Sequence, residues 1–156
     1  MPYILITSDQ SSINEKIVAA IDIVKFRLGE GQWPLYKATP FLYDLKKEDK
    51  CLVYLAGKNQ FSQHFVGHFE ILEVRQSQNP DKEENKLGIL TQKPVREIIF
   101  KPTLIMQPVS VRELLKHLDH TSKVTDKTWG AKFMGGVRRI SNNDFDLIKQ
   151  KLNNKN

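Results

Sequence analysis

The stretch Phe65-Val-Gly-His-Phe-Glu-Ile-Leu-Glu-Val74 decides what kind of sheet this chain can build. Its apolar residues alternate onto one face of a strand as far as Ile71, and then onto the opposite face at Leu72 and Val74. This change of face predicts a bulge or a sharp bend near Ile71, as small barrels have. We therefore expect a strongly bent sheet.

Further strands are expected on both sides of this bend. Tyr3-Ile-Leu-Ile-Thr7 and Cys51-Leu-Val-Tyr-Leu55 are short apolar runs rich in β-branched and aromatic residues, which is typical of buried strands. Residues 87–90 and 95–106 can supply more strands. Residues 31–40, rich in glycine and proline, are expected to be irregular, and the charged residues 77–86 to form an exposed loop.

Three capping-box patterns, each a serine followed three residues later by an acidic residue, predict where helices begin: Ser12 with Glu15, Ser110 with Glu113 and Ser141 with Asp144. The first helix is expected over residues 13–28, with Gly29 as its cap and with one apolar face: Ile13, Ile17, Ile21, Val24 and Leu28. Residues 120–136 resemble a loop. The pattern predicts one domain over residues 1–152 with a frayed end at 153–156, in an α+β fold: a strongly bent mixed sheet or open β-barrel of about five to six strands flanked by helices.

Composition limits the class of protein. With 156 residues, 40% of them apolar and 27% charged, the chain can build a globular core and is not disordered throughout. A single cysteine, Cys51, excludes an intramolecular disulfide and fits a reducing compartment. The sequence shows neither a secretory signal nor a membrane span, and we expect a cytoplasmic protein without membrane contact.

The net charge of +6 lies entirely in the last third of the chain. Residues 1–100 contain 13 basic and 13 acidic residues, whereas residues 101–156 contain 11 basic and 5 acidic residues. A sequence pI of about 9.4 with this asymmetry indicates an anionic partner, nucleic acid first and a membrane surface second. The alternative is a basic surface that only keeps the protein soluble.

Nothing in the sequence indicates catalysis or a resident metal or other cofactor. His64 and His68 are four residues apart, but in a strand this spacing separates them by ~13 Å, too far for one ion. Cys51 begins an apolar strand, where a cysteine is usually a small hydrophobic residue. The common phosphate-loop, dinucleotide and hydrolase motifs are missing from the sequence.

Two tryptophans lie in segments rich in glycine, proline and lysine. Trp33 and Trp129 could stack on nucleic-acid bases, which contributes ~1–3 kcal/mol per base, or each could cover the hydrophobic core. Basic residues near Trp129 could contact phosphates or form a solvated surface: Lys127, Lys132, Arg138 and Arg139.

Several segments, in this order, resemble the EVE domain of the PUA-like superfamily, which is related to YTH domains. They are Tyr3-Ile-Leu-Ile-Thr-Ser8-Asp9, Trp33-Pro-Leu, the run from Leu45 to Gly57 that ends in Tyr-Leu-Ala-Gly, Val109-Ser-Val-Arg-Glu-Leu, and Lys132-Phe-Met-Gly-Gly-Val137 with its continuation to Ser141. Glu48 stands where the family has a turn glycine before the aspartate. The resemblance spans nearly the whole chain.

The resemblance implies a PUA-like fold with a concave pocket that accepts a flipped-out, modified nucleobase in DNA or RNA. By position, Trp33 and Met134 would be walls of the pocket, and Ser8 and Asp9 would bond the base edge or order the pocket. Further lining candidates are Leu35, Thr39, Tyr54 and, as a second aromatic residue, Trp129. The expected function is thus a non-catalytic nucleic-acid-binding module of unspecified oligomeric state. The alternatives are a small PUA-like enzyme acting on RNA or nucleotides, and an adaptor that binds a protein or small ligand.

Overall fold

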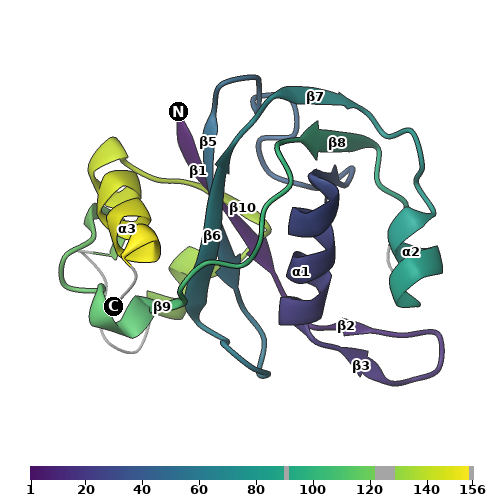
Figure 1. Cartoon of the computed structure of the whole chain (residues 1–156), viewed down its shortest axis with the longest axis horizontal. Coiled ribbons are helices and arrows are strands. Elements are labelled where there is room, and N and C mark those ends of the chain that lie inside the picture. The colour runs from purple at the N-terminus through teal and green to yellow at the C-terminus, as the bar shows by residue number, and fades with distance from the viewer. Residues whose placement is uncertain (90–91, 122–128, 155–156) are drawn as a thin grey trace.

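The computed structural model describes residues 1–89, 92–121 and 129–154. Within these ranges a five-stranded sheet has the order β10-β1-β5-β6-β9 (Figure 1). Its strands are β1 (Pro2–Thr7), β5 (Lys50–Leu55), β6 (His64–Glu70), β9 (Val109–Ser110) and β10 (Val137–Arg139). β1 and β5 pair in parallel, and the other neighbours are antiparallel. Both strands of the parallel pair are apolar and almost fully buried, as is usual for parallel strands.

A smaller sheet continues from the first one and has the order β4-β8-β7. Its strands are β4 (Gln32–Leu35), β7 (Glu73–Gln76) and β8 (Arg96–Ile99), and a separate hairpin contains β2 (Gln10–Ser11) and β3 (Ile17–Val18). At the junction the amide of Ile71 still donates to Asp49 (2.9 Å), whereas the amide of Leu72 already donates to Ile99 (2.8 Å). The bend predicted near Ile71 is thus the point at which the chain passes from one sheet to the other.

Helices cover both faces of the large sheet. α3 (Asn142–Asn153) lies on one face and α1 (Ala20–Glu30) on the other, and α2 (Lys82–Leu87) lies beyond α1 (Figure 1). Three 3₁₀ turns connect the rest: Val111–Glu113, Asp119–Thr121 and Trp129–Phe133.

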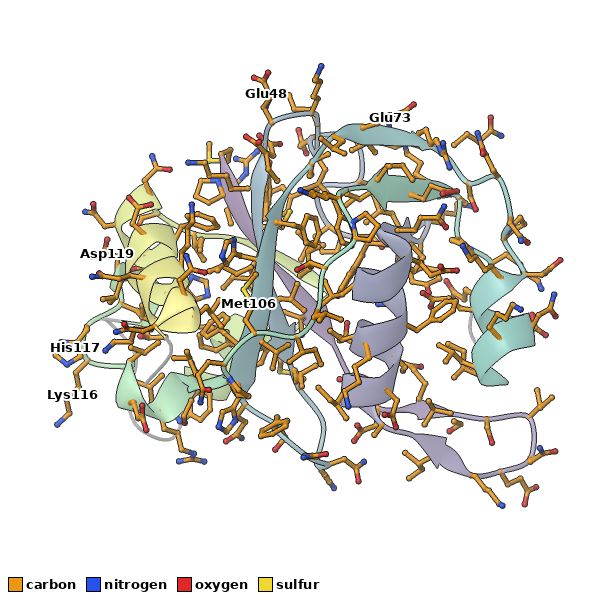
Figure 2. All side chains as sticks on the ribbon, viewed as in Figure 1. Glu48, Glu73, Met106, Lys116, His117 and Asp119 are labelled. Carbon is orange, nitrogen blue, oxygen red and sulfur yellow. The ribbon has the colours of Figure 1, made fainter. Side chains whose placement is uncertain are left out.

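Each face of the sheet therefore has its own apolar core (Figure 2). Alternation along β1 sends Tyr3 and Leu5 to the core under α1 and Ile4 to the core under α3. In the first core the rings of Phe69 and Phe100 stack at 3.7 Å. Met106, labelled in Figure 2, packs against the second core.

The predicted start of the first helix is wrong. α1 begins at Ala20, and the preceding residues form the β2–β3 hairpin. The Ser12 hydroxyl accepts hydrogen bonds from the amides of Asn14 and Lys16, so it closes the turn of the hairpin and caps no helix. Ile13 and Ile17, expected on the buried face, are 58% and 69% exposed. At the other end Gly31, with φ 67°, takes the capping role assigned to Gly29.

Other expectations need smaller corrections. Residues 32–35 are a strand where an irregular segment was expected, and 82–87 form α2 inside the predicted loop. In the described part of residues 87–90, Ile89 makes an isolated bridge to Ser12 and no strand forms. Ser110 precedes a 3₁₀ turn, whereas Ser141 does cap a helix, accepting from the amide of Asp144. α3 extends to Asn153, the first residue of the expected frayed end.

Candidate nucleic-acid interface

The carboxyl ends of β1 and β5 meet at one edge of the large sheet. The two strands are parallel neighbours, and the amide of Ala56 donates to the carbonyl of Thr7 at 2.8 Å just beyond their last pair. The segment 134–136 runs beside this edge, where the amide of Ile6 donates to the carbonyl of Gly136 at 2.7 Å. Gly135 and Gly136 have φ of 92° and 86°, a conformation that favours glycine. We call residues 134–136 the ridge, because cavities open on both sides of it.

The first cavity, of about 440 Å³, lies between the end of β1 and the turn after β4. Ser8, Thr39 and Gly135 contribute to its lining, together with Thr7, Arg27 and Tyr36. Thr39 closes the turn by accepting a hydrogen bond from the amide of Tyr36 at 2.8 Å. Two residues of the expected base pocket, Ser8 and Thr39, are therefore brought together here, beside a charged group.

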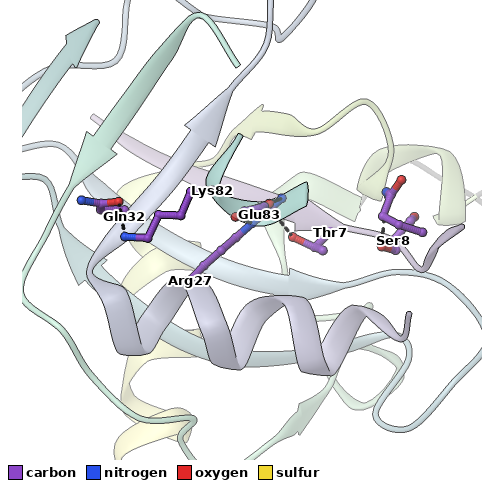
Figure 3. Close-up of polar contacts among 7 residues, drawn as sticks. Thr7, Ser8, Arg27, Gln32, Lys82 and Glu83 are labelled. Carbon is purple, nitrogen blue, oxygen red and sulfur yellow. Dashed lines mark hydrogen bonds and ion pairs between the residues drawn. The ribbon is translucent and has the colours of Figure 1, made fainter. Parts of the chain in front are cut away.

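Arg27 supplies that charge and is held from several directions (Figure 3). Its Nε and Nη2 donate to the two carboxylate oxygens of Glu83 at 2.7 and 2.8 Å, and its Nη1 donates to Thr7 Oγ1 at 3.2 Å. Burial by itself lowers the pKa of Arg27, but the charge and hydrogen bonds of Glu83, with a smaller contribution from Tyr36, outweigh it and raise the pKa. The cavity thus contains a permanently charged, oriented guanidinium.

Asp9 orders the surroundings of the first cavity. Its Oδ1 accepts from the amide of Ala20 (2.8 Å), the first residue of α1, and its Oδ2 accepts from the amide of Lys58 (2.9 Å). Burial raises the pKa of Asp9, but hydrogen bonds from Lys58, Ala20 and Asn59 outweigh it and hold the pKa below its ordinary value. A Cβ on Gly57 would lie 2.6 Å from Asp9 Oδ2, so the carboxylate fits only against glycine. The carboxylate thus ties the start of α1 to the segment after β5.

Trp33 and Leu35 lie elsewhere than expected. Both are on β4 and point into the core under α1, with 3% and 1% of their surface exposed. The guanidinium of Arg27 lies over the Trp33 ring at 4.8 Å. The structure therefore places Arg27, and neither of these apolar side chains, at the surface of the first cavity. No pattern in the sequence marks Arg27 as a cavity residue, because a single arginine in a helix usually faces solvent.

The second cavity, of about 360 Å³, lies on the other side of the ridge and brings together Tyr54, Trp129 and Met134. The rings of Tyr54 and Phe133 stack at 4.8 Å, and Trp129 meets Phe133 edge-on at 6.1 Å. Burial raises the pKa of Tyr54, with Arg112 opposing this shift. Three residues of the expected pocket thus meet in this cavity, apart from Ser8 and Thr39 and from the buried Trp33.

The two arginines expected to bind phosphate lie on opposite faces of the large sheet. Arg138 and Arg139 are consecutive residues of β10 and pair with Ile4 and Tyr3, which face opposite cores. Arg138 donates to the carbonyls of Met134 (2.8 Å) and Ala131 (2.9 Å) and so holds the ridge. Arg139 instead lies over the ring of Phe41 at 4.7 Å.

The structure says less about the two lysines predicted to bind phosphate. The backbone carbonyl of Lys132 accepts a hydrogen bond from the His120 ring at 2.7 Å, and its side chain is half-buried. Lys127 lies outside the described residues.

Among the described residues, no group of three or more histidine, cysteine or acidic side chains could hold a metal ion. His64 bonds the carbonyl of Ser62, and His68 bonds the side chain of Asn153. Cys51 is fully buried, which raises the pKa of its thiol. No helix in the described part of the chain is long and apolar enough to cross a membrane.

The sequence matches the EVE domain over residues 12–151. The chain belongs to the EVE domain family. Solved structures agree with this assignment at the level of the fold. Human THYN1 in complex with 5-methylcytosine-containing DNA is 13% identical, with 99% of both chains covered and a TM-score of 0.59. The DUF55 domain of human thymocyte nuclear protein 1 is also 13% identical, with coverage of 99% and 100% and a TM-score of 0.60.

An ASCH protein from Zymomonas mobilis is 6% identical, with coverage of 96% and 94% and a TM-score of 0.56. No curated protein matches the sequence significantly. The expected PUA-like α+β fold with an open, strongly bent sheet is confirmed for this EVE domain.

Proposed function

We propose that this EVE domain binds nucleic acid without acting on it chemically and receives a modified, flipped-out nucleobase in the first cavity. The observation that carries the proposal is the cavity itself, whose volume of about 440 Å³ falls in the range of small-ligand pockets, ~300–1,000 Å³. Its support from relatives is the human THYN1 structure, which shares the fold and contains 5-methylcytosine DNA.

The chemistry of the lining fits a base edge. Ser8 and Thr39 carry hydroxyls that can donate or accept hydrogen bonds, and Arg27 donates only. A base that leaves such groups unpaired is rejected strongly, because buried polar groups without partners are costly. Arg27 is already paired with Glu83, so its charge is compensated. It can therefore orient a base in the cavity through hydrogen bonds.

The test is binding measured by fluorescence anisotropy, with short single-stranded and duplex DNA and RNA probes at fixed salt. Each probe is compared in its unmodified form and with N6-methyladenine or a 5-substituted cytosine. We expect a preference of tenfold or more for one modified probe, which corresponds to about 1.4 kcal/mol. Equal affinity for every modified probe and its unmodified form would overturn the proposal.

A cavity-filling variant locates the site. Ala38 is exposed and lines the first cavity, so Ala38→Phe adds bulk there while removing no buried contact. We expect Ala38→Phe to abolish the preference for the modified base and to keep the salt-dependent binding to all probes. Ala38→Ser, which adds one atom at the same position, should bind as the parent does. A preference that survives Ala38→Phe would place the base outside this cavity.

A further inference from the structure

We propose that the second cavity is a separate nucleotide subsite. When the modified base lies in the first cavity, the adjacent nucleotide of the same strand binds in the second cavity and stacks on the guanidinium of Arg112. The proposal rests on the proposed function, because it takes the nucleic-acid strand to be anchored in the first cavity. It gives Tyr54, Trp129 and Met134 a role distinct from holding the modified base.

The two cavities are close enough for consecutive nucleotides. Thr7 lines the first cavity and Ala56 the second, and the two residues are joined by a backbone hydrogen bond of 2.8 Å. Their strands are neighbours in one sheet, where the spacing is ~4.8 Å. Across the ridge, Gly135 lines the first cavity and the preceding residue, Met134, lines the second. A strand that crosses the ridge passes directly from one cavity to the other.

Arg112 has the placement of a stacking platform. Its guanidinium lies over the Trp129 ring at 5.2 Å, and its Nε donates to Gln63 Oε1 at 3.1 Å. The side chain is exposed, and no carboxylate among the described residues lies within ion-pair distance of it. Trp129 and Gln63 thus hold an exposed cation in the lining of the second cavity. Guanidinium planes stack on unpaired bases, and the positive charge also attracts the phosphates.

The remaining walls of the second cavity suit the flat face of a base. Met134 is 61% exposed and offers an apolar contact at the ridge, where Arg138 fixes its carbonyl. Below it, the stacked rings of Tyr54 and Phe133 form a rigid floor. Every base has an apolar face, so this subsite is expected to accept any base next to the modified one. The first cavity, in contrast, is expected to select the modified base.

The contrast with Arg27 supports this division. Arg27 donates to both oxygens of Glu83 and is 6% exposed, so its charge is neutralised within the fold. Arg112 bonds to a neutral amide and is exposed, so its charge remains available to a ligand. Arg27 therefore orients a base in the first cavity, and Arg112 attracts the nucleic acid to the second cavity.

The experiment uses single-stranded probes of about five nucleotides with the preferred modified base at the centre. In two further probes the nucleotide on the 5′ or the 3′ side of that base is abasic, which keeps the phosphates and removes the stacking face. We expect Arg112→Ala to weaken binding of the intact probe about tenfold or more, which is the scale of one lost base stack. One of the two abasic probes should bind the parent protein about tenfold more weakly than the intact probe does. Arg112→Ala should reduce the affinity for that abasic probe little further.

Two variants separate stacking from charge. Arg112→Lys keeps the charge without the flat guanidinium and should lose most of the same affinity. Lys116→Ala removes one exposed positive charge from the same segment, on a side chain that points away from the fold (Figure 2), and should weaken all probes slightly and equally. Thermal unfolding of each variant checks that it is folded. Losses for Arg112→Ala that match those of Lys116→Ala on every probe would overturn the subsite.

Failure of the two proposals gives different results. If base reading fails, the parent protein binds modified and unmodified probes equally. If only the subsite fails, the preference for the modified base persists while abasic replacement on either side changes nothing.

Discussion

Helices α1 and α2 are neighbours in this fold, yet they are attached to it by different interactions (Figure 1). α1 buries an apolar face against the large sheet, with Ile21, Val24 and Leu28 in the core between them. No side chain of α2, all of which lies in a described range, is buried. It is held by the ion pair of Glu83 with Arg27 and by the hydrogen bond from Lys82 to Gln32, both drawn in Figure 3. A second ion pair joins Lys82 to Glu30.

The difference matters because the weakly attached helix fixes a group of the first cavity. A six-residue helix has little stability of its own and depends on its contacts. Glu83 is the α2 residue that holds Arg27, so the guanidinium in the first cavity is oriented by a helix that buries none of its own side chains. Substitutions in the two helices should therefore change the free energy of unfolding by different amounts and with a different dependence on salt.

The largest effect is expected from Leu28→Ala in α1. Leu28 is fully buried, and its Cδ1 lies 3.5 Å from where a Cβ on Gly67 would be, so the space is closely filled. We expect the free energy of unfolding to fall by about 4 kcal/mol, within the ~2–5 kcal/mol typical of such substitutions. Urea denaturation measures it, and the loss should not depend on salt. A loss below about 1 kcal/mol would mean that α1 is not anchored by this face.

Glu83→Gln should have an intermediate effect. It leaves the buried guanidinium of Arg27 without its counter-charge, which costs ~3–5 kcal/mol in a fully enclosed pair. Because α2 can move away and admit water, we expect a loss of about 2 kcal/mol in the free energy of unfolding, measured in the same way.

Glu84→Gln is the matched control for this prediction. Glu84 is the next residue of α2 and pairs with the exposed Lys93. It should leave stability unchanged. Equal effects of the two substitutions would show that the Arg27 pair is no different from a surface pair.

Asp9 adds a pH-dependent contribution where the start of α1 meets the segment after β5. Its pKa is lowered in the folded protein, so its contribution to stability is complete above about pH 4 and is lost as the pH falls through the folded-state pKa. We expect Asp9→Asn to flatten the dependence of stability on pH below about pH 4, measured by thermal unfolding at a series of pH values. An unchanged acid profile would contradict the role of its three hydrogen bonds.

The smallest effect is expected from Lys93→Ala. Lys93 bonds to Asp81 and Glu84, which raises its pKa, but the lysine is exposed and such pairs contribute little. We expect no measurable change in the denaturation midpoint at physiological salt. A clear loss would show that the outer side of α2 also matters for its attachment.

The sequence predicted those elements whose signals are local. Ser141 and Asp144 mark the start of α3, and the change of face near Ile71 marks the bend between the sheets. The start of α1 was missed because the Ser12-x-x-Glu15 pattern also suits a turn, and apolar residues at helical spacing occur by chance in the exposed hairpin. Trp33 was placed in a loop because its neighbours are glycine and proline, whereas β4 is a strand that tolerates Pro34.

The structure brings the expected pocket residues together only in part, since Trp33 and Leu35 lie in the core. Ser8 and Thr39 do meet in one cavity, and Tyr54, Trp129 and Met134 meet in another. The two groups are separated by the ridge, residues 134–136. The position of the ridge beside β1 depends on contacts between residues far apart in the sequence, and no local pattern predicts these contacts. The pair of Arg27 and Glu83 is likewise formed by residues 56 positions apart, and each reads in the sequence as an ordinary surface charge.

The position of β1 has a consequence for how the chain is made. Its Tyr3 pairs with Cys51 on one side and with Arg139 on the other, so β1 completes its backbone pairing only when β10, far along the chain, is available. Contacts so distant along the chain form slowly, and an unpaired edge can meanwhile pair with other chains. A nascent or truncated chain that lacks residues 137–139 would expose one side of an apolar strand. Aggregation during synthesis, more than instability of the finished fold, is the hazard built into this topology.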